Sequence, residues 1–136
     1  MFQVRVLYAD TDMAGVVYHA NYLRYFEAAR TDALYRVGVD LAQLHTEQGI
    51  VFAISDCSLQ FHRSARYGDT LQIKVLVRKI GPARVTLGYE VRCNGGDELY
   101  VTGETTFAAL DAASGRVVRL PGAMRDGLQQ ALEAAL

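Results

Sequence analysis

The sequence is poor in the residues that cross-link small domains or carry a chain into a membrane. Its 136 residues include two cysteines and two prolines, and there is no tryptophan. Cys57 and Cys93 lack the paired spacing of a zinc or redox motif and lie in runs typical of strands, so we expect reduced thiols in the core. No apolar run is long enough to span a bilayer, and the N-terminus alternates where a signal peptide would be continuously apolar. We predict one domain over residues 1–136, in the cytoplasm.

The chain also lacks an excess of charge and several well-known catalytic motifs. A formal net charge of −1 offers no general attraction for nucleic acid or for an anionic membrane. There is no G-x-S-x-G nucleophile elbow, no P-loop and no G-x-G-x-x-G after a strand. His19, His45 and His62 are too scattered to suggest a metal site by their spacing. We therefore expect no nucleic acid partner, no metal and no membrane insertion.

The N-terminal third combines a strand, a loop and a long helix. Apolar and polar residues alternate over positions 2–8, which predicts a strand with one buried face. Residues 10–15 break this pattern and predict a loop. From Tyr22, apolar residues at positions 22, 25, 26, 29, 33 and 37 follow the spacing of one helical face. Asn21 is the best local candidate for the N-cap, and Gly38 supplies a C-terminal stop.

The rest of the chain is predicted to be mainly sheet. After a connector over 39–49, alternation predicts strands over about 51–63, 70–80, 84–93 and 98–110, joined by Gly-rich turns. Short turns require antiparallel neighbours. Met124, Leu128, Leu132 and Leu136 predict a terminal amphipathic helix over 122–136. The fold class is therefore α+β. Since one helix covers one sheet face, the other face is expected to meet a second copy or the terminal helix.

Two carboxylates in the loop, Asp10 and Asp12, precede the long helix. They can be read as turn residues that bind backbone N–H groups, or as catalytic groups beside a helix N-terminus, where backbone N–H groups stabilise developing negative charge. Glu27 is a competing carboxylate, although it can also pair with Arg30 at i, i+3 on a solvated face. His19 is a further candidate for a general base. The residues alone leave these alternatives open.

The ordered motif of this region resembles a known enzyme family. It reads Y-x-D-T-D-x-x-G-V-V-Y-H-x-x-Y over residues 8–22, followed by F-E-x-A-R over 26–30. This pattern is similar to the 4-hydroxybenzoyl-CoA thioesterase group of the hotdog-fold superfamily, and above all to the acyl-CoA thioesterases associated with the Tol–Pal system. The resemblance implies a hotdog fold, in which an antiparallel sheet wraps around one long central helix. It also implies a homodimer or homotetramer with active sites at the dimer interface.

The resemblance further assigns roles to individual residues. The second acid of the D-x-D element, Asp12, corresponds to the catalytic carboxylate, and the backbone N–H of His19 corresponds to the group that polarises the thioester carbonyl. A cleft shared by two subunits should then bring Asp12 within a few ångströms of the amide-rich end of the long helix. The residues implied in substrate binding are Val16, Tyr18, Phe52, Ala53 and Ile54 around the acyl group and Arg84 at the CoA nucleotide.

The implied activity is hydrolysis of an acyl-CoA, with Asp12 as nucleophile or general base. The acyl group, aliphatic or aromatic, stays open, and no cofactor is expected because CoA is part of the substrate. A second hypothesis is a non-catalytic module that binds acyl-CoA or an acyl carrier protein in an envelope-associated complex. The intact Asp-Thr-Asp loop argues against it. A hotdog hydratase acting on enoyl thioesters is less favoured, because no second basic residue lies at a suitable spacing from Asp12.

Overall fold

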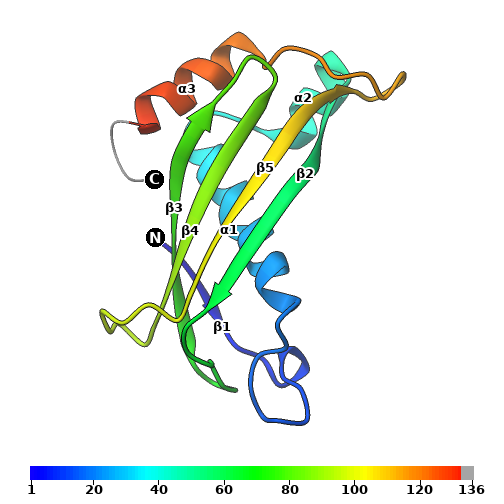
Figure 1. Cartoon of the computed structure of the whole chain (residues 1–136). Helices are drawn as coiled ribbons and strands as arrows, with labels where there is room; N and C mark the ends of the chain where they lie inside the picture. The colour runs from blue at the N-terminus through cyan, green and yellow to red at the C-terminus, as the bar shows by residue number, and fades with distance from the viewer. Residues whose placement is uncertain (133–136) are drawn as a thin grey trace.

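The structure, a computed structural model, describes residues 1–132 and contains a curled antiparallel sheet packed on a long helix (Figure 1). The strand order is β1-β3-β4-β5-β2, and all neighbours are antiparallel. The elements in chain order are β1 (Phe2–Arg5), η1 (Tyr8–Asp10), α1 (Asn21–Arg36), α2 (Leu41–Gln48), β2 (Ile50–Phe61), β3 (Thr70–Ile80), β4 (Arg84–Cys93), β5 (Val101–Asp111) and α3 (Gly122–Leu132). The predicted α+β class, with one long helix against an antiparallel sheet, is confirmed. No described helix is long and apolar enough to cross a bilayer.

The helix α1 crosses the concave side of the sheet and supplies much of the core. Five of the six predicted apolar positions are buried, together with Leu34. The closest approach to the sheet is at Gly103 of β5, where an added Cβ would lie 2.7 Å from the Phe26 ring and 2.8 Å from the Ser58 carbonyl oxygen. Phe26 also stacks on Tyr89 of β4, with ring centroids 4.2 Å apart. A side chain at position 103 would therefore push the helix off the sheet.

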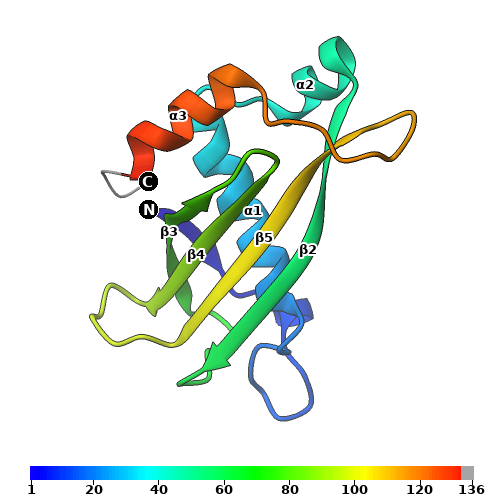
Figure 2. The ribbon, with the colours of Figure 1, turned by 45° about the horizontal axis from the view of Figure 1, so that its top comes forward.

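The terminal helix α3 packs against β3 and the C-terminal end of α1, and not on the opposite face of the sheet. Met124 and Leu128 are buried in the same core as α1, and an added Cβ on Gly127 would lie 2.7 Å from the Val37 carbonyl oxygen. Both helices are seen on one side of the sheet in Figure 2. The expectation that α3 might cover the opposite face is wrong. Leu132 is exposed, and Leu136 lies outside the described residues.

The convex face of the sheet is largely polar. It carries charged side chains that pair along and across the strands. Arg92 and Glu90 pair within β4, with N···O of 3.0 Å, and Arg78 of β3 lies 4.0 Å from Glu104 of β5, across β4. A polar face of this kind can remain in water, as one face of an antiparallel sheet commonly does. This face therefore does not require a second copy of the chain to cover it.

The long strand β2 instead leaves one edge of the sheet open. It has twelve residues and pairs on one side with β5, with a register shift between Ile54 and Asp56. In the chain no described strand pairs with its other side, and residues 53–58 are exposed. An open edge of this length presents unpaired N–H and C=O groups that a further strand can use. Cys57 lies on this edge and is exposed, so the prediction of a core thiol is wrong for Cys57 and right for Cys93.

Several element boundaries and one helix differ from the sequence prediction. The strands over 70–80 and 84–93 are found as predicted, and the others agree within a few residues. The connector over 39–49 contains α2, which Asp40 caps through its side chain and Gly49 ends at φ 62°. The long helix begins at Asn21 with Ala20 at the N-cap position, and the Asn21 side chain binds elsewhere.

Candidate active site

The loop between η1 and α1 is closed by its own backbone. The Asp12 N–H donates to the Val16 carbonyl at 2.9 Å, and the Gly15 N–H donates to the Asp12 carbonyl at 2.9 Å. Gly15 takes φ 80°, a left-handed conformation that favours glycine. The Val17 N–H donates to the Ala65 carbonyl at 2.8 Å, which ties the loop to the segment after β2. Residues 12–16 therefore form a fixed turn at one end of the molecule.

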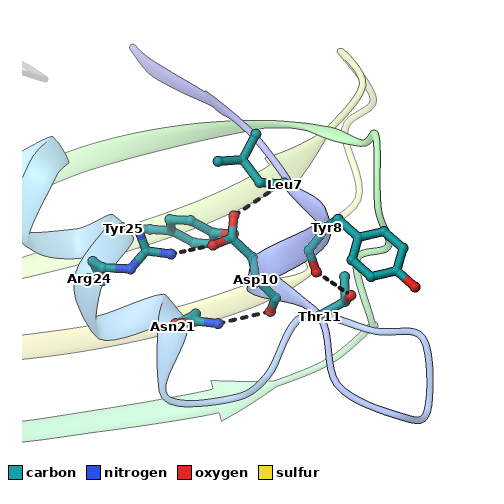
Figure 3. A network of polar contacts seen from close by, with 7 residues as sticks. All are labelled: Leu7, Tyr8, Asp10, Thr11, Asn21, Arg24 and Tyr25. Atoms are coloured by element: carbon teal, nitrogen blue, oxygen red, sulfur yellow. Dashed lines mark hydrogen bonds and ion pairs between the residues drawn. The ribbon is translucent and has the colours of Figure 1, made fainter.

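The first carboxylate of the motif, Asp10, is buried and anchors this loop to α1 (Figure 3). One carboxylate oxygen accepts the Leu7 N–H at 2.9 Å and the Tyr25 hydroxyl at 2.8 Å, and the other pairs with Arg24. Its backbone carbonyl accepts the Asn21 side-chain amide at 2.8 Å. These contacts join the strand end, the loop and the first turn of α1 into one unit.

The electrostatics of this network match a structural carboxylate. Burial raises the pKa of Asp10, but the hydrogen bonds from Leu7 and Tyr25 and the Arg24 guanidinium outweigh burial and leave the pKa below its usual value. Burial, with the hydrogen bond to Asp10, raises the pKa of the Tyr25 hydroxyl. Asp10 is therefore ionised at neutral pH, and both of its oxygens already have partners. It is not available to attack a substrate.

The second carboxylate, Asp12, stands at the exposed side of the turn. One of its oxygens accepts the Ala14 N–H at 2.9 Å, and the residues described give the other oxygen no hydrogen-bond donor. None of the larger cavities described within a single chain is lined by Asp12. These cavities of the single chain therefore do not supply the cleft expected in front of this side chain.

The entry to α1 offers backbone donors beside this loop. The Tyr18 N–H donates to the Asp10 carbonyl at 2.9 Å, and the Asn21 N–H donates to the Tyr18 carbonyl at 2.9 Å. Between these two, no acceptor for the His19 N–H occurs among residues 1–132. Helix N-termini carry such unsatisfied N–H groups together with the positive end of the helix dipole. The His19 N–H can therefore donate a hydrogen bond to an acceptor atom of a ligand.

Two of the residues implied in substrate binding belong to the same loop. Val16 is half-buried, and its backbone bridges to Arg66 in the segment after β2. Tyr18 is exposed, and its ring lies against the His19 imidazole with centroids 4.4 Å apart. Asp12, Val16, Tyr18 and His19 thus form one group, which we call the loop group.

A second group lies at the other end of β2, beside a cavity of about 360 Å³ between α1, α2 and β2. Phe52 and Ile54 line this cavity, whereas Ala53 is absent from its lining and, by strand alternation, faces the opposite side of the sheet. Figures 1 and 2 show the loop before α1 near the end of β2. The β2 residues that line the cavity, in contrast, come from the first half of that strand. The structure does not bring the two groups together within one chain.

Comparison with known proteins places these features in a family. The model of the thioesterase-like superfamily matches residues 6–132. The chain belongs to this superfamily. The predicted hotdog fold and the prediction of an enzyme that hydrolyses thioesters are confirmed at this level.

Individual relatives agree with the family. The chain is 33% identical over 134 residues to a 1,4-dihydroxy-2-naphthoyl-CoA hydrolase of Thermosynechococcus vestitus, covering 98% of this chain and 91% of the relative. It is 32% identical over 120 residues to the acyl-CoA thioesterase YbgC of Haemophilus influenzae, covering 88% and 87%. Among solved structures, the DHNA-CoA thioesterase of Staphylococcus aureus is 31% identical with a TM-score of 0.84, covering 88% of this chain and 78% of the other.

In this superfamily member, Arg84 lies far from the loop group. It is exposed at the start of β4 and lines a cavity of about 380 Å³ together with Lys79, next to the turn between β3 and β4. Figure 1 shows this turn at the end of the sheet opposite the loop group. Within one chain, Arg84 cannot contact a ligand group held by Asp12.

The pairing of Glu27 with Arg30, offered from their i, i+3 spacing, is not formed. Arg30 instead donates to the Tyr89 hydroxyl on β4 at 3.1 Å, while Glu27 stays exposed. Both side chains line the cavity beside Phe52. The helix thus presents a carboxylate and a guanidinium to this cavity.

Sequence reasoning missed the residues that hold the loop. Arg24 and Tyr25 bind Asp10, yet they read only as a polar and an apolar position of an amphipathic helix. The signal that could have pointed to them is an arginine in the first turn of the helix that follows the D-x-D loop. In the structure Arg24 pairs with Asp10, the first aspartate of the element, and not with Asp12.

Proposed function

We propose that this chain is an acyl-CoA thioester hydrolase in which Asp12 is the catalytic carboxylate and the His19 N–H binds the thioester carbonyl. The observation that carries this proposal is the division of roles within the D-x-D element. Asp10 is buried, and both of its carboxylate oxygens have partners. Asp12 is exposed and is held by one hydrogen bond, and residues 1–132 give its second oxygen no donor. A carboxylate in this state can act on a substrate.

The chemistry needs little beyond these two groups. A thioester has weak resonance between sulfur and carbonyl and a thiolate leaving group, so a serine triad is not required. The His19 N–H and the α1 dipole would bind the carbonyl oxygen and stabilise the negative charge that develops there. Asp12 would either attack the carbonyl carbon to form an anhydride, which water then hydrolyses, or direct a water molecule onto that carbon.

A second copy of the chain would complete the site by pairing along β2. If the β2 strands of two chains pair in antiparallel fashion near their middle, the two strands run in opposite directions. Phe52 and Ile54 of the second copy then lie near the end of β2 of the first, where the loop group lies. The same reversal carries the second copy's Arg84 to that end of the sheet. The three separated groups of one chain would then meet as one site shared by two chains. Each dimer would have two such sites, and a tetramer would require a further interface.

The relatives suggest the kind of substrate. One carries the name of a dihydroxynaphthoyl-CoA hydrolase and another that of an acyl-CoA thioesterase. We therefore propose an acyl-CoA as substrate, with an aromatic or a short aliphatic acyl group. An acyl carrier protein as alternative donor, membership of the Tol–Pal-associated subgroup and a cytoplasmic location remain proposals that rest on the sequence.

A non-catalytic acyl-CoA-binding module is the second candidate. It is favoured by one observation, namely that Asp12 lines none of the larger cavities described within the single chain over residues 1–132. The dimer of the first proposal accounts for that observation, since the cleft would then lie between two chains. A binding module has no need for a free carboxylate beside the bound carbonyl.

The test is thiol release measured with a colorimetric thiol reagent across a panel of acyl-CoAs. We expect Asp12→Asn to lower kcat by orders of magnitude, since it removes the group that performs the chemical step. Because Asp12 is exposed and asparagine keeps an oxygen for the Ala14 N–H, the unfolding midpoint should stay unchanged. Asp32→Asn, which alters an exposed carboxylate on α1, away from the loop, is the control. Tight acyl-CoA binding by the wild type without thiol release would favour the binding module, and full turnover by Asp12→Asn would move the catalytic role to Glu27 or His19.

A further inference from the structure

The cavity between α1, α2 and β2 is mostly apolar but holds one guanidinium. Leu34, Phe52, Ile54 and Phe107 are among its lining residues, and Arg30 reaches it from α1. The neighbouring carboxylate, Glu27, is exposed, whereas Arg30 is half-buried. Of the two charged residues that α1 presents to this cavity, Arg30 is thus the more buried.

The guanidinium of Arg30 is held in place by a buried hydrogen-bond chain. Its Nη1 donates to the Tyr89 hydroxyl at 3.1 Å, and that hydroxyl bonds to the Thr105 hydroxyl at 2.7 Å. Tyr89 is itself fixed by its stack on Phe26. One of the five N–H donors of a guanidinium is accounted for in this way. The rest are available to a ligand with a defined geometry.

Arg30 differs from every other arginine of the described chain. Five of the others form ion pairs with carboxylates: Arg24, Arg36, Arg63, Arg78 and Arg92. The remaining ones outside an ion pair are all exposed to water. Over residues 1–132, Arg30 alone is half-buried without a carboxylate partner. A charge partly removed from water is costly unless it is paired, so this position favours an anion.

We propose that Arg30 is a specificity-determining residue that selects acyl groups ending in a carboxylate. This inference rests on the proposed function, in which the cavity receives the acyl group of a thioester. A carboxylate matches the planar fork of a guanidinium and can accept two parallel hydrogen bonds from it. The apolar walls would contact the methylene chain between the thioester and that carboxylate. The substrate class is thus the CoA monothioester of a dicarboxylic acid.

The test compares two substrates of equal length, adipoyl-CoA and hexanoyl-CoA, which differ in the terminal carboxylate. We expect wild-type kcat/KM to be at least tenfold higher for adipoyl-CoA. Arg30→Gln should lower the adipoyl-to-hexanoyl ratio of kcat/KM by roughly 10- to 100-fold, the range that a charge-assisted hydrogen bond corresponds to. Arg30→Lys keeps the charge but loses the fork and should retain part of the preference. Because both substrates are assayed on one preparation, the ratio is insensitive to a loss of folded protein.

Two further variants separate recognition from a structural effect. Tyr89→Phe removes the hydroxyl that positions the guanidinium and should lower the ratio to an intermediate value. Arg36→Gln alters an exposed arginine of the same helix, paired with Asp32, and should leave the ratio unchanged. Turnover of hexanoyl-CoA without a preference for adipoyl-CoA, or an unchanged ratio in Arg30→Gln, overturns this inference and leaves the hydrolase proposal standing. Failure of the wild type to release thiol from any acyl-CoA overturns both.

Discussion

Replacing Asp10 with alanine should destabilise the fold strongly, although Asp10 is not the carboxylate proposed to act on substrate. The substitution removes the acceptor for the Tyr25 hydroxyl, for the Leu7 N–H and for the Arg24 guanidinium. Tyr25 is 3% exposed, so its hydroxyl would have no access to water. The loop would also lose its attachment to the first turn of α1.

The size of the effect follows from the burial of each partner. An orphaned buried hydroxyl costs about 1–3 kcal/mol, and the Leu7 N–H, near the surface, contributes about 1 kcal/mol. The Arg24 side chain is 60% exposed, so solvent screening limits its pairing to about 0–1 kcal/mol. The sum is about 2–5 kcal/mol, a large part of the roughly 5–15 kcal/mol of a typical domain. Arg24→Ala alone should cost less than about 1 kcal/mol.

Urea denaturation followed by circular dichroism, at one protein concentration, measures this difference. We expect the midpoint of Asp10→Ala to fall with little change in the slope. Tyr25→Phe should cost about 1 kcal/mol, and Asp12→Ala, on the exposed side of the loop, should stay within about 0.5 kcal/mol of wild type. If Asp10→Ala were as stable as Asp12→Ala, the assignment of Asp10 as the anchor of the loop would be refuted.

Three further predictions follow from the same structure. Because the pKa of Asp10 is lowered in the folded protein, the ionised carboxylate stabilises the fold fully above the ordinary aspartate pKa, and this stabilisation is lost as the pH falls through the pKa of the folded state. Urea midpoints measured between neutral pH and pH 3 should show the loss, and Asp10→Asn should reduce this dependence on pH. Gly103→Ala should lower the free energy of unfolding by about 1–3 kcal/mol, because the new Cβ meets an aromatic ring and a backbone carbonyl. Gly88→Ala, whose Cβ meets only a flexible arginine side chain, should lower it clearly less. Equal losses in urea denaturation would contradict the packing described. Pairing of two β2 strands near their middle brings the Cys57 thiols of two chains to within about three residues of each other along the strands, roughly 10 Å. A short bismaleimide should therefore give a covalent dimer that Cys57→Ser abolishes. A cross-link that persists in Cys57→Ser would place the contact elsewhere.

The sheet and the long helix could be predicted from the sequence because both carry strong periodic patterns of apolar residues. The strands β3 and β4 alternate without interruption on either side of the Gly81-Pro82 turn, and both were placed to the residue. The helix α2 was missed although Asp40 and Gly49 supply a cap and a stop, because its eight residues hold two large apolar ones and no repeated face. Cys57 alternates correctly with its neighbours, but whether an edge strand is covered depends on elements that no local pattern reveals.

The candidate site shows the same limit more sharply. The D-x-D element contains two aspartates in similar surroundings, and the difference between them arises from Tyr25, fifteen residues after Asp10. The partner of Arg30 is Tyr89, 59 positions away, and not the nearby Glu27. Such contacts are created by the packing of α1 on the sheet. Local spacing therefore indicated where the chemistry is concentrated, but not which side chain holds the loop and which is free.

The open edge of β2 also has a consequence for how activity depends on protein concentration. If each site needs the loop of one chain and the cavity of another, a separated chain holds two incomplete halves and no working centre. Turnover per mole of protein would then decline on dilution and recover on concentration, in the manner of a mass-action switch. The amount of this protein in a cell, and not only its sequence, would set how active each molecule is.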